Sequence, residues 1–277
     1  MKIKDFDISR KTLLKSVNPL KKLNREISNY VTKKQKEIEE LKAMELFRRE
    51  FLADVSHELK TPIFAAQGFI HTLLDGAMDD PAVLERFLIK AAKSLDGLDA
   101  LVRDLVTLTQ VESGDLKMNF ESVNLIEKTE DIFEQLENKA SLRGTKLKIK
   151  SKDVKNALVV ADNQRITQVL TNLIDNAIKY GKENGKIIVE FEEDKKHIQV
   201  SVEDDGPGIP PEDLTRIFER FYRVDKSRSR ETGGTGLGLA IVKHILNAHN
   251  SKISVSSKLE KGTKFTFKLD KANSILN

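Results

Sequence analysis

The chain has 277 residues, 39% hydrophobic and 32% charged, which is the composition of a soluble protein long enough for two domains. Its 47 basic and 43 acidic residues leave a net charge of +4 without a basic, aromatic-interleaved stripe, which argues against nucleic-acid binding as the main function. The absence of cysteine excludes disulfides and thiolate metal sites, and no apolar run reaches the ~20 residues that a membrane-spanning helix requires.

A helical repeat of apolar residues follows a polar N-terminal stretch. Steps of three and four residues run from Leu13 to Phe47 on a strongly charged background, and the repeat slips near residues 33–36. We interpret residues 1–43 as an N-terminal signalling helix that forms a coiled coil, in preference to a single amphipathic surface helix.

The repeat continues into Ser56-His57-Glu58-Leu59-Lys60-Thr61-Pro62, within a helix predicted to end near Leu74. His57 lies about 200° around the helix from the apolar Val55, whereas Thr61, four residues later, shares the face of His57. A single histidine in such a position is most often an exposed surface side chain, so the pattern by itself leaves its role open.

A second helix is predicted from Asp79-Asp80-Pro81 to Ser113-Gly114, with carboxylates and proline at its start. Residues 44–112 would thus form a helical hairpin. Two helices cannot cover its long apolar faces, whereas two copies make an antiparallel four-helix bundle, so we expect a homodimer. Residues 113–118 are interpreted as a linker.

Beyond the linker the pattern becomes mixed α/β over residues 119–271, followed by a tail at 272–277. Alternating and helical periodicities distinguish the two kinds of element. The predicted helices cover 125–139, 163–180 and 237–247, and the predicted strands cover 146–150, 157–160, 186–192, 197–203, 252–256 and 263–269.

Three segments of this region carry polar groups suited to a nucleotide. Asn172, Asn176 and Lys179 share one helix face, where amide oxygens suit Mg²⁺ and an ammonium group suits phosphate. Asp204, at the end of a strand and before a glycine turn, can accept a hydrogen bond from an exocyclic amine. The glycine-rich run 233–238 leads into a helix whose first N–H groups can meet phosphates. Its G-x-G-x-G spacing fits neither a Rossmann nor a P-loop motif.

These segments, in this order over residues 44–270, resemble the boxes of bacterial two-component sensor histidine kinases. The matching runs are S-H-E-L-K-T-P at 56–62, N-L-I-D-N-A-I-K-Y-G at 172–181, D-D-G-P-G-I at 204–209, I-F-E-R-F-Y-R at 217–223 and G-G-T-G-L-G-L at 233–239. The resemblance implies an α plus α/β fold, with a dimeric four-helix bundle followed by the α/β-sandwich ATP-binding domain of gyrase-type ATPases. Asp205 departs from the asparagine that the family often has, and leaves Asp204 in place.

The resemblance also implies a function, that of a protein histidine kinase (ATP:protein-L-histidine phosphotransferase). His57 would take the phosphoryl group of ATP with help from Glu58, and a response-regulator receiver domain would accept it. Thr61 would assist dephosphorylation of the regulator, Asn176 would bind Mg²⁺, and Asp204 would bind adenine. The other residues expected to contact ATP are Asn172, Lys179, Tyr180, Gly206, Gly208, Ile209, Tyr222, Arg223, Gly234, Thr235, Gly236, Leu237, Gly238, Leu239 and Thr263.

Two alternatives stay in view: an ATPase or ATP-gated scaffold of the same superfamily without phosphotransfer, and a coiled-coil scaffold with a degenerate kinase domain. Residues 225–232 are charged or polar throughout and are expected to form a loop over the nucleotide. The expected location is the cytoplasm, for a complete cytosolic kinase or for the cytoplasmic part of an inner-membrane receptor. The stimulus, the cognate regulator and the choice between cis and trans phosphorylation stay open.

Overall fold

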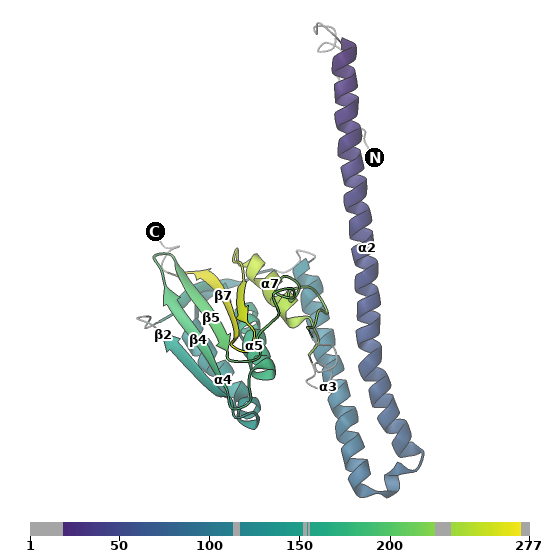
Figure 1. Cartoon of the computed structure of the whole chain (residues 1–277), viewed down its shortest axis with the longest axis vertical. Coiled ribbons are helices and arrows are strands. Elements are labelled where there is room, and N and C mark those ends of the chain that lie inside the picture. The colour runs from purple at the N-terminus through teal and green to yellow at the C-terminus, as the bar shows by residue number, and fades with distance from the viewer. Residues whose placement is uncertain (1–18, 113–116, 152–153, 155, 225–233, 273–277) are drawn as a thin grey trace. The chain divides into compact units, whose positions relative to one another are not determined.

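The computed structural model describes residues 19–112, 117–151, 154, 156–224 and 234–272 (Figure 1). Its internal contacts divide the chain into two units, residues 1–58 and 59–277. Among the described residues, no helix combines the length and the apolar character needed to cross a membrane. The predicted order, a helical hairpin followed by an α/β domain, is confirmed.

The first helix, α2, covers Pro19–Leu74 and ends at the predicted residue. It passes through residues 33–36 without interruption, while the predicted helical start at Leu13 lies outside the described residues. A short 3₁₀ helix that the sequence did not indicate, η1 at Ala77–Asp79, follows it.

The second helix of the hairpin, α3, covers Pro81–Glu112. Asp80 begins it as expected from the sequence, because its Oδ1 accepts a hydrogen bond from the N–H of Ala82 at 3.0 Å. The rings of Phe69 in α2 and Phe87 in α3 meet with their centroids 5.6 Å apart. Many large apolar side chains of the hairpin nevertheless remain exposed, among them Phe64, Ile70, Leu88, Ile89 and Leu95.

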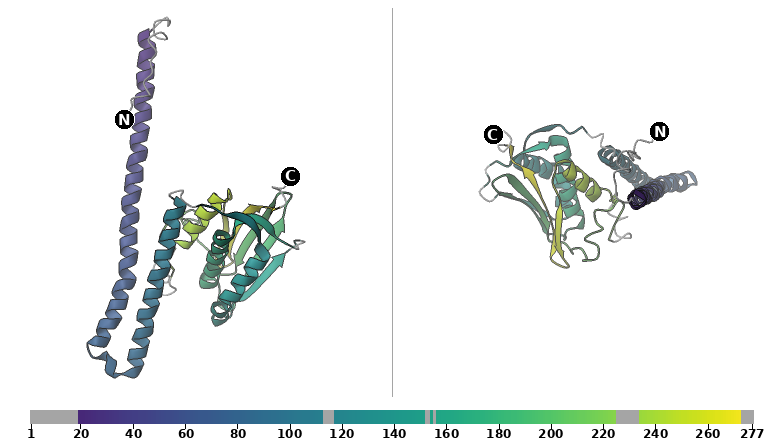
Figure 2. Two further views of the ribbon diagram at one scale, coloured as in Figure 1. Left: turned by 180° about the vertical axis from the view of Figure 1, so that it is seen from behind. Right: turned by 90° about the horizontal axis from the view of Figure 1, so that it is seen from above.

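The α/β domain is built on a five-stranded sheet in the order β2-β4-β5-β7-β6, with β2 and β4 parallel and the other neighbours antiparallel. A separate two-stranded antiparallel sheet pairs β1 with β3. Three helices, α4, α5 and α7, pack on one face of the large sheet (Figures 1 and 2). The bounds are β1 Phe120–Asn124, α4 Leu125–Leu142, β2 Lys146–Ser151, β3 Leu158–Asp162, α5 Asn163–Tyr180, β4 Lys186–Glu193, β5 His197–Asp204, α7 Gly238–Ala248, β6 Ser254–Lys258 and β7 Gly262–Asp270.

The core lies between this sheet and its helices. Alternate residues of a strand point to one face, and on the helix-covered face of the three central strands these residues are almost all apolar. They are Ile187, Val189, Phe191, Ile198, Val200, Val202, Phe265, Phe267 and Leu269, all buried. The opposite face is polar apart from Ile188, and it carries ion pairs such as Lys264 Nζ to Glu190 Oε2 at 3.1 Å.

The sequence placed most elements correctly but missed or shifted three strands. It gave no sign of β1, because only Val123 of F-E-S-V-N is buried and the strand exists through its pairing with β3. The strand predicted at 157–160 extends to Asp162, a polar residue that also begins α5 by accepting the N–H of Arg165. The strand predicted at 252–256 lies at Ser254–Lys258, where the turn into β7 sets its register.

A buried histidine ties the end of α7 to the junction of β3 and α5. His249 Nε2 accepts a hydrogen bond from the backbone N–H of Asp162 at 3.0 Å, so the proton of the neutral ring is on Nδ1, 2.8 Å from the carbonyl of Ile245. Burial lowers the pKa of His249, which keeps the ring neutral at neutral pH. This histidine is therefore a structural residue.

Candidate functional site

His57 projects from α2 with 69% of its side chain exposed, as the sequence predicted from its position off the apolar stripe. Its Nδ1 lies 3.6 Å from Oε1 of Glu58, whose side chain is 29% exposed. Thr61 is also exposed, one turn further along the helix. The imidazole is thus accessible to a second reactant and has a carboxylate beside one of its two nitrogens.

The predicted polar face of α5 exists, and its two asparagines differ in what they contact. Asn172 donates from Nδ2 to the carbonyl of Gly238 at 3.3 Å, which ties α5 to the first turn of α7. Asn176 is half-buried, and within the part of the chain that the structure describes its side-chain amide forms no hydrogen bond. Asn172 thus ties two helices together through its amide nitrogen, whereas the whole side-chain amide of Asn176 is available to a ligand.

Lys179 is held by an aspartate that the sequence reading overlooked. Its Nζ lies 2.7 Å from Oδ2 of Asp175, and Lys139 of α4 lies 3.1 Å from Oδ1. Burial by itself raises the pKa of Asp175, but the two ammonium groups outweigh it and hold the pKa below its usual range. The i, i+4 spacing of Asp175 and Lys179 was the signal that could have shown this pair.

Asp204 ends β5 and is the one acidic residue among the predicted nucleotide-contacting residues of the α/β domain. Its Oδ1 accepts the N–H of Gly206 at 2.9 Å. Burial raises the pKa of Asp204 to about 6, against the lowering effect of backbone hydrogen bonds from Gly206 and Thr263. A desolvated carboxylate of this kind gains from a ligand that donates a hydrogen bond to it.

The turn after Asp204 requires its glycines because other backbone passes close by. A Cβ on Gly206 would lie 2.7 Å from the carbonyl oxygen of Tyr180, and one on Gly208, where φ is +76°, would lie 2.4 Å from the carbonyl oxygen of Lys258. Ile209 donates its N–H to Ser257 Oγ at 2.8 Å, and Ser257 Oγ is 2.9 Å from Oγ1 of the buried Thr263. These contacts fix the turn between α5 and the β6–β7 hairpin.

The segment before α7 is held by residues of the 217–223 run. Phe221 donates its N–H to the carbonyl of Gly236 at 2.9 Å, and the guanidinium group of Arg223 donates to the carbonyl of Gly234. The hydroxyl of Tyr222 instead donates to Oδ1 of Asp213 at 2.5 Å, which raises the pKa of Tyr222. Leu237 is fully buried, whereas Leu239 is partly exposed. Gly233 and the loop predicted over 225–232 lie outside the described residues.

Two acidic residues of α3, Asp104 and Glu112, contact the segment before α7 and its neighbours. The sequence did not predict these contacts. Thr235 donates its hydroxyl to Oδ2 of Asp104 at 2.7 Å and accepts the N–H of Leu237 at 3.2 Å. Burial raises the pKa of Asp104, although the hydrogen bond from Thr235 opposes it. Glu112 pairs with Arg220 and, at 3.3 Å, with Nε2 of His244. On a helix with a charged outer face, nothing in the sequence separates these two acids from solvated ones.

The side-chain oxygen of Asn176 is a ligand that suits a magnesium ion arriving with a nucleotide. Among the described residues, no group of three or more His, Cys, Asp or Glu side chains could hold a metal ion. Asn176 offers one neutral oxygen, and Mg²⁺ prefers hard oxygen ligands and commonly takes the rest of its shell from water and substrate phosphates. Asn176 would therefore hold the ion, whose role would be to neutralise phosphate charge.

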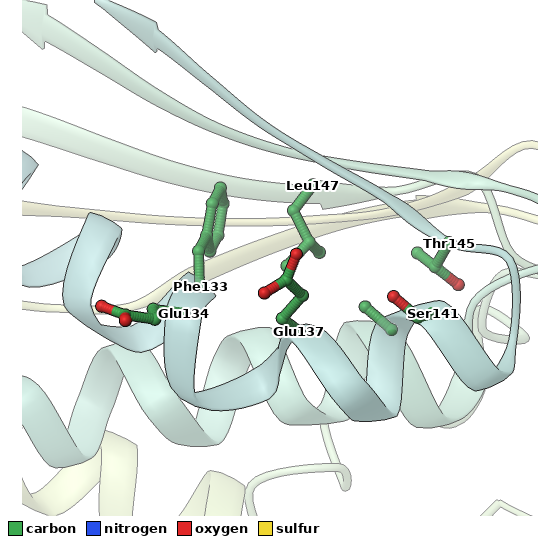
Figure 3. A pocket seen from close by; sticks show the side chains of 7 residues that line it. Phe133, Glu134, Glu137, Ser141, Thr145 and Leu147 are labelled. Atoms are coloured by element: carbon green, nitrogen blue, oxygen red, sulfur yellow. The ribbon is translucent and has the colours of Figure 1, made fainter.

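A separate pocket of about 350 Å³ lies between α4 and β2 (Figure 3). None of the predicted site residues lines it. The lining carries two glutamates and no basic group, so it does not suit a triphosphate. Its walls are formed by Phe133, Glu134, Glu137, Ala140, Ser141, Thr145 and Leu147.

Two family models match the chain. Residues 47–114 match the His Kinase A (phospho-acceptor) domain, and residues 161–273 match the histidine kinase-, DNA gyrase B- and HSP90-like ATPase family. The first match contains His57, and the second contains Asn176, Asp204 and the segment 234–239.

Individual relatives agree with these matches. The chain is 37% identical over 235 residues to the sensor histidine kinase WalK of Bacillus subtilis, covering 84% of this chain and 38% of that protein. It is 35% identical over 231 residues to the sensor protein SrrB of Staphylococcus aureus, covering 82% of this chain and 39% of that protein. The chain thus spans about two-fifths of the length of these relatives.

Solved structures give the same result. The Acinetobacter baumannii histidine kinase AdeS matches with a TM-score of 0.63 and 32% identity, covering 78% of this chain and 98% of that one. The histidine kinase ThkA, solved in complex with the response regulator protein TrrA, matches with a TM-score of 0.66 and 30% identity, covering 82% and 62%. With a phosphoacceptor hairpin and an ATPase domain in this order, the chain belongs to the sensor histidine kinases of two-component systems.

Proposed function

We propose that the chain transfers the γ-phosphoryl group of ATP to His57 and then to an aspartate of a response regulator. The observation that carries this proposal is the exposed His57–Glu58 pair within the residues that match a phosphoacceptor domain. The match also disfavours the alternative of an ATPase without phosphotransfer, which would need no such pair. The solved complex of ThkA with TrrA supports a response regulator as the partner.

The chemistry of the first step follows from the two ring nitrogens of His57. Nδ1 faces Glu58, so we assign Nε2 as the nucleophile. As Nε2 bonds to the γ-phosphorus, the bond from that phosphorus to the bridging oxygen breaks and ADP leaves. Attack turns the ring into a phosphorylated imidazolium, and the carboxylate of Glu58 takes the proton from Nδ1 as a general base, a contribution of about 10²–10⁴-fold.

The ATPase domain supplies the binding energy and orientation for this step. Asp204 accepts a hydrogen bond from the adenine amino group, Asn176 holds the magnesium ion, and the N–H groups that begin α7 meet the phosphates. Because His57 lies on α2 and these residues lie in the α/β domain, the two parts must meet during turnover.

The proposal is tested by incubating the chain with γ-labelled ATP and Mg²⁺. We expect a phosphoprotein whose label is lost in acid and kept in base, as a phosphoramidate requires, and no label with EDTA or with Asn176→Ala. A label that survives acid would indicate a hydroxyl acceptor and contradict the proposal.

Thr61→Ala is expected to slow dephosphorylation of the regulator by about tenfold or more while autophosphorylation stays within about twofold. The threonine hydroxyl lies one turn from His57, where it can orient water but takes no part in the attack on ATP. The measurement is the decay of label on a receiver domain that the wild-type chain has phosphorylated. Thr72→Ala is the matched control, since Thr72 is an exposed threonine of the same helix that bonds to the carbonyl of Gly68. Unchanged decay in Thr61→Ala would remove Thr61 from this role.

We also propose that the chain is a homodimer through residues 44–112. The exposed apolar side chains of the hairpin support this, because a second copy would cover them. Sedimentation of the full chain at micromolar concentration is expected to show a dimer, and Leu95→Glu is expected to shift it toward monomer. Leu95 is 51% exposed, and the control Leu142→Glu changes an 89% exposed leucine of α4. A monomeric wild type contradicts the proposal.

A further inference from the structure

The carbonyl groups at the end of α5 accept hydrogen bonds from Arg143, a residue that lies outside all the motifs matched above. The final carbonyls of a helix have no intrahelical partner and carry a partial negative charge. Arg143, at the end of α4, donates from Nη1 to the carbonyl of Lys179 at 2.8 Å and from Nη2 to the carbonyl of Gly181 at 3.0 Å. One guanidinium fork thus holds the carbonyl on each side of Tyr180.

The backbone around the same residue holds the loop that follows α5. The carbonyl of Arg143 accepts the N–H of Asn184 at 2.9 Å, and at the start of β2 Lys146 donates its N–H to the carbonyl of Gly185. This loop continues to Lys186, whose N–H lies 3.1 Å from both carboxylate oxygens of Asp205. The segment from Arg143 to Lys146 therefore fixes residues 179–185 at both ends, and Asp205 holds the next residue, Lys186.

The segment that Arg143 holds, residues 179–181, packs directly against the turn that follows Asp204. A Cβ added at Gly206 would lie 2.7 Å from the carbonyl oxygen of Tyr180 and 3.0 Å from Cα of Gly181. At such distances no other group fits between the two backbone segments. A displacement of Tyr180–Gly181 is therefore transmitted directly to Gly206, whose N–H donates to Asp204.

We propose that Arg143 is a positioning residue for the adenine end of the nucleotide site. It acts through residues 179–181, which set the position of the Asp204 carboxylate, and it does not touch the nucleotide. The proposal rests on the proposed function, because it requires Asp204 to bind adenine. It predicts an effect on recognition of the base that is separate from any effect on phosphate binding.

The test measures the dissociation constants of Mg-ATP and Mg-GTP for the full chain and for Arg143 variants. In Arg143→Met we expect the dissociation constant for ATP to rise about tenfold and that for GTP to change by less than about twofold, so that the preference for ATP falls. Arg143→Lys keeps a cation at the helix end and is expected to recover part of the preference. Arg143→Gln keeps one donor, and it gives the same measurement if the methionine variant does not fold.

Lys128→Met is the matched control, because it removes one positive charge from α4 where Lys128 pairs with the exposed Asp131. We expect wild-type affinities for both nucleotides in this variant. A purely structural Arg143 would lower the melting temperature and leave the ratio of the two constants unchanged; an unchanged ratio in the glutamine or methionine variant overturns the inference. Equal binding of ATP and GTP by the wild-type chain would instead contradict the assignment of Asp204, whatever Arg143 does.

Discussion

Replacing His57 with alanine is expected to abolish phosphoprotein formation from γ-labelled ATP, by about a thousandfold or more. Loss of the nucleophile removes the bond-forming atom itself, and no other part of the site can supply it. ATP affinity is expected to stay within about twofold, because His57 is not among the residues that bind the nucleotide in our proposal. The measurement is acid-labile label per chain, together with the dissociation constant for ATP.

His71 provides the control for this variant. It is an exposed histidine of the same helix, α2, so His71→Ala makes the same chemical change where we assign no reaction. We expect wild-type labelling in His71→Ala. If the label persists in His57→Ala and disappears in His71→Ala, the phosphoryl acceptor is His71, and the assignment of His57 is refuted.

Asp204→Asn is expected to weaken ATP binding about 10- to 100-fold and at the same time to stabilise the domain at neutral pH. The loss of affinity corresponds to a hydrogen bond made to a charged acceptor, about 1.5–3 kcal/mol. The gain in stability arises because the folded protein holds this carboxylate in a desolvated position, where its pKa is raised to about 6.

The pH dependence distinguishes this gain from other causes. Below the ordinary carboxyl pKa, near 4, Asp204 is protonated in both the folded and the unfolded state and has no effect on stability. As pH rises toward 6 the unfolded state ionises first, so the free energy of unfolding falls, by up to about 3 kcal/mol in total. Asp204→Asn should therefore match wild type near pH 4 and exceed it at pH 7–8.

Urea denaturation at pH 4, 6 and 8 measures this difference, and nucleotide binding is measured on the same samples. Glu203→Gln, which changes the exposed neighbouring acid, is expected to leave ATP affinity unaltered. A variant Asp204→Asn that binds ATP as wild type does would show that this carboxylate does not bind the base. A stability difference that does not vary with pH would contradict the raised pKa.

The sequence was sufficient for those parts of the site that are local. His57 and Glu58 are neighbours in the chain, and the periodicity of α2 fixes the side of the helix on which His57 lies. Asp204 and Gly206 are likewise two residues apart at the end of a strand. In these cases the spacing along the chain already determines the geometry.

Residues that act across the fold could not be found in this way. Arg143 meets α5 through a contact 36 residues along the chain, and Asp104 meets Thr235 across 131 residues. Each is a charged residue on a charged helix, so neither periodicity nor composition separates it from a solvated neighbour. Strand β1 was missed for a related reason, since it depends on β3 and has little apolar alternation of its own.

The exposed edge of the large sheet at β2 affects how copies of the ATPase domain associate with one another. Its outer side has no neighbouring strand in the described structure, and such an edge can pair with the same edge of another molecule. Lys146, Lys148 and Lys150 alternate along it and are all exposed. Two such edges brought together would set these ammonium groups against one another. Like-charge repulsion at β2 therefore opposes strand-to-strand polymerisation of the ATPase domain, which protects the chain from aggregation where its copies are concentrated.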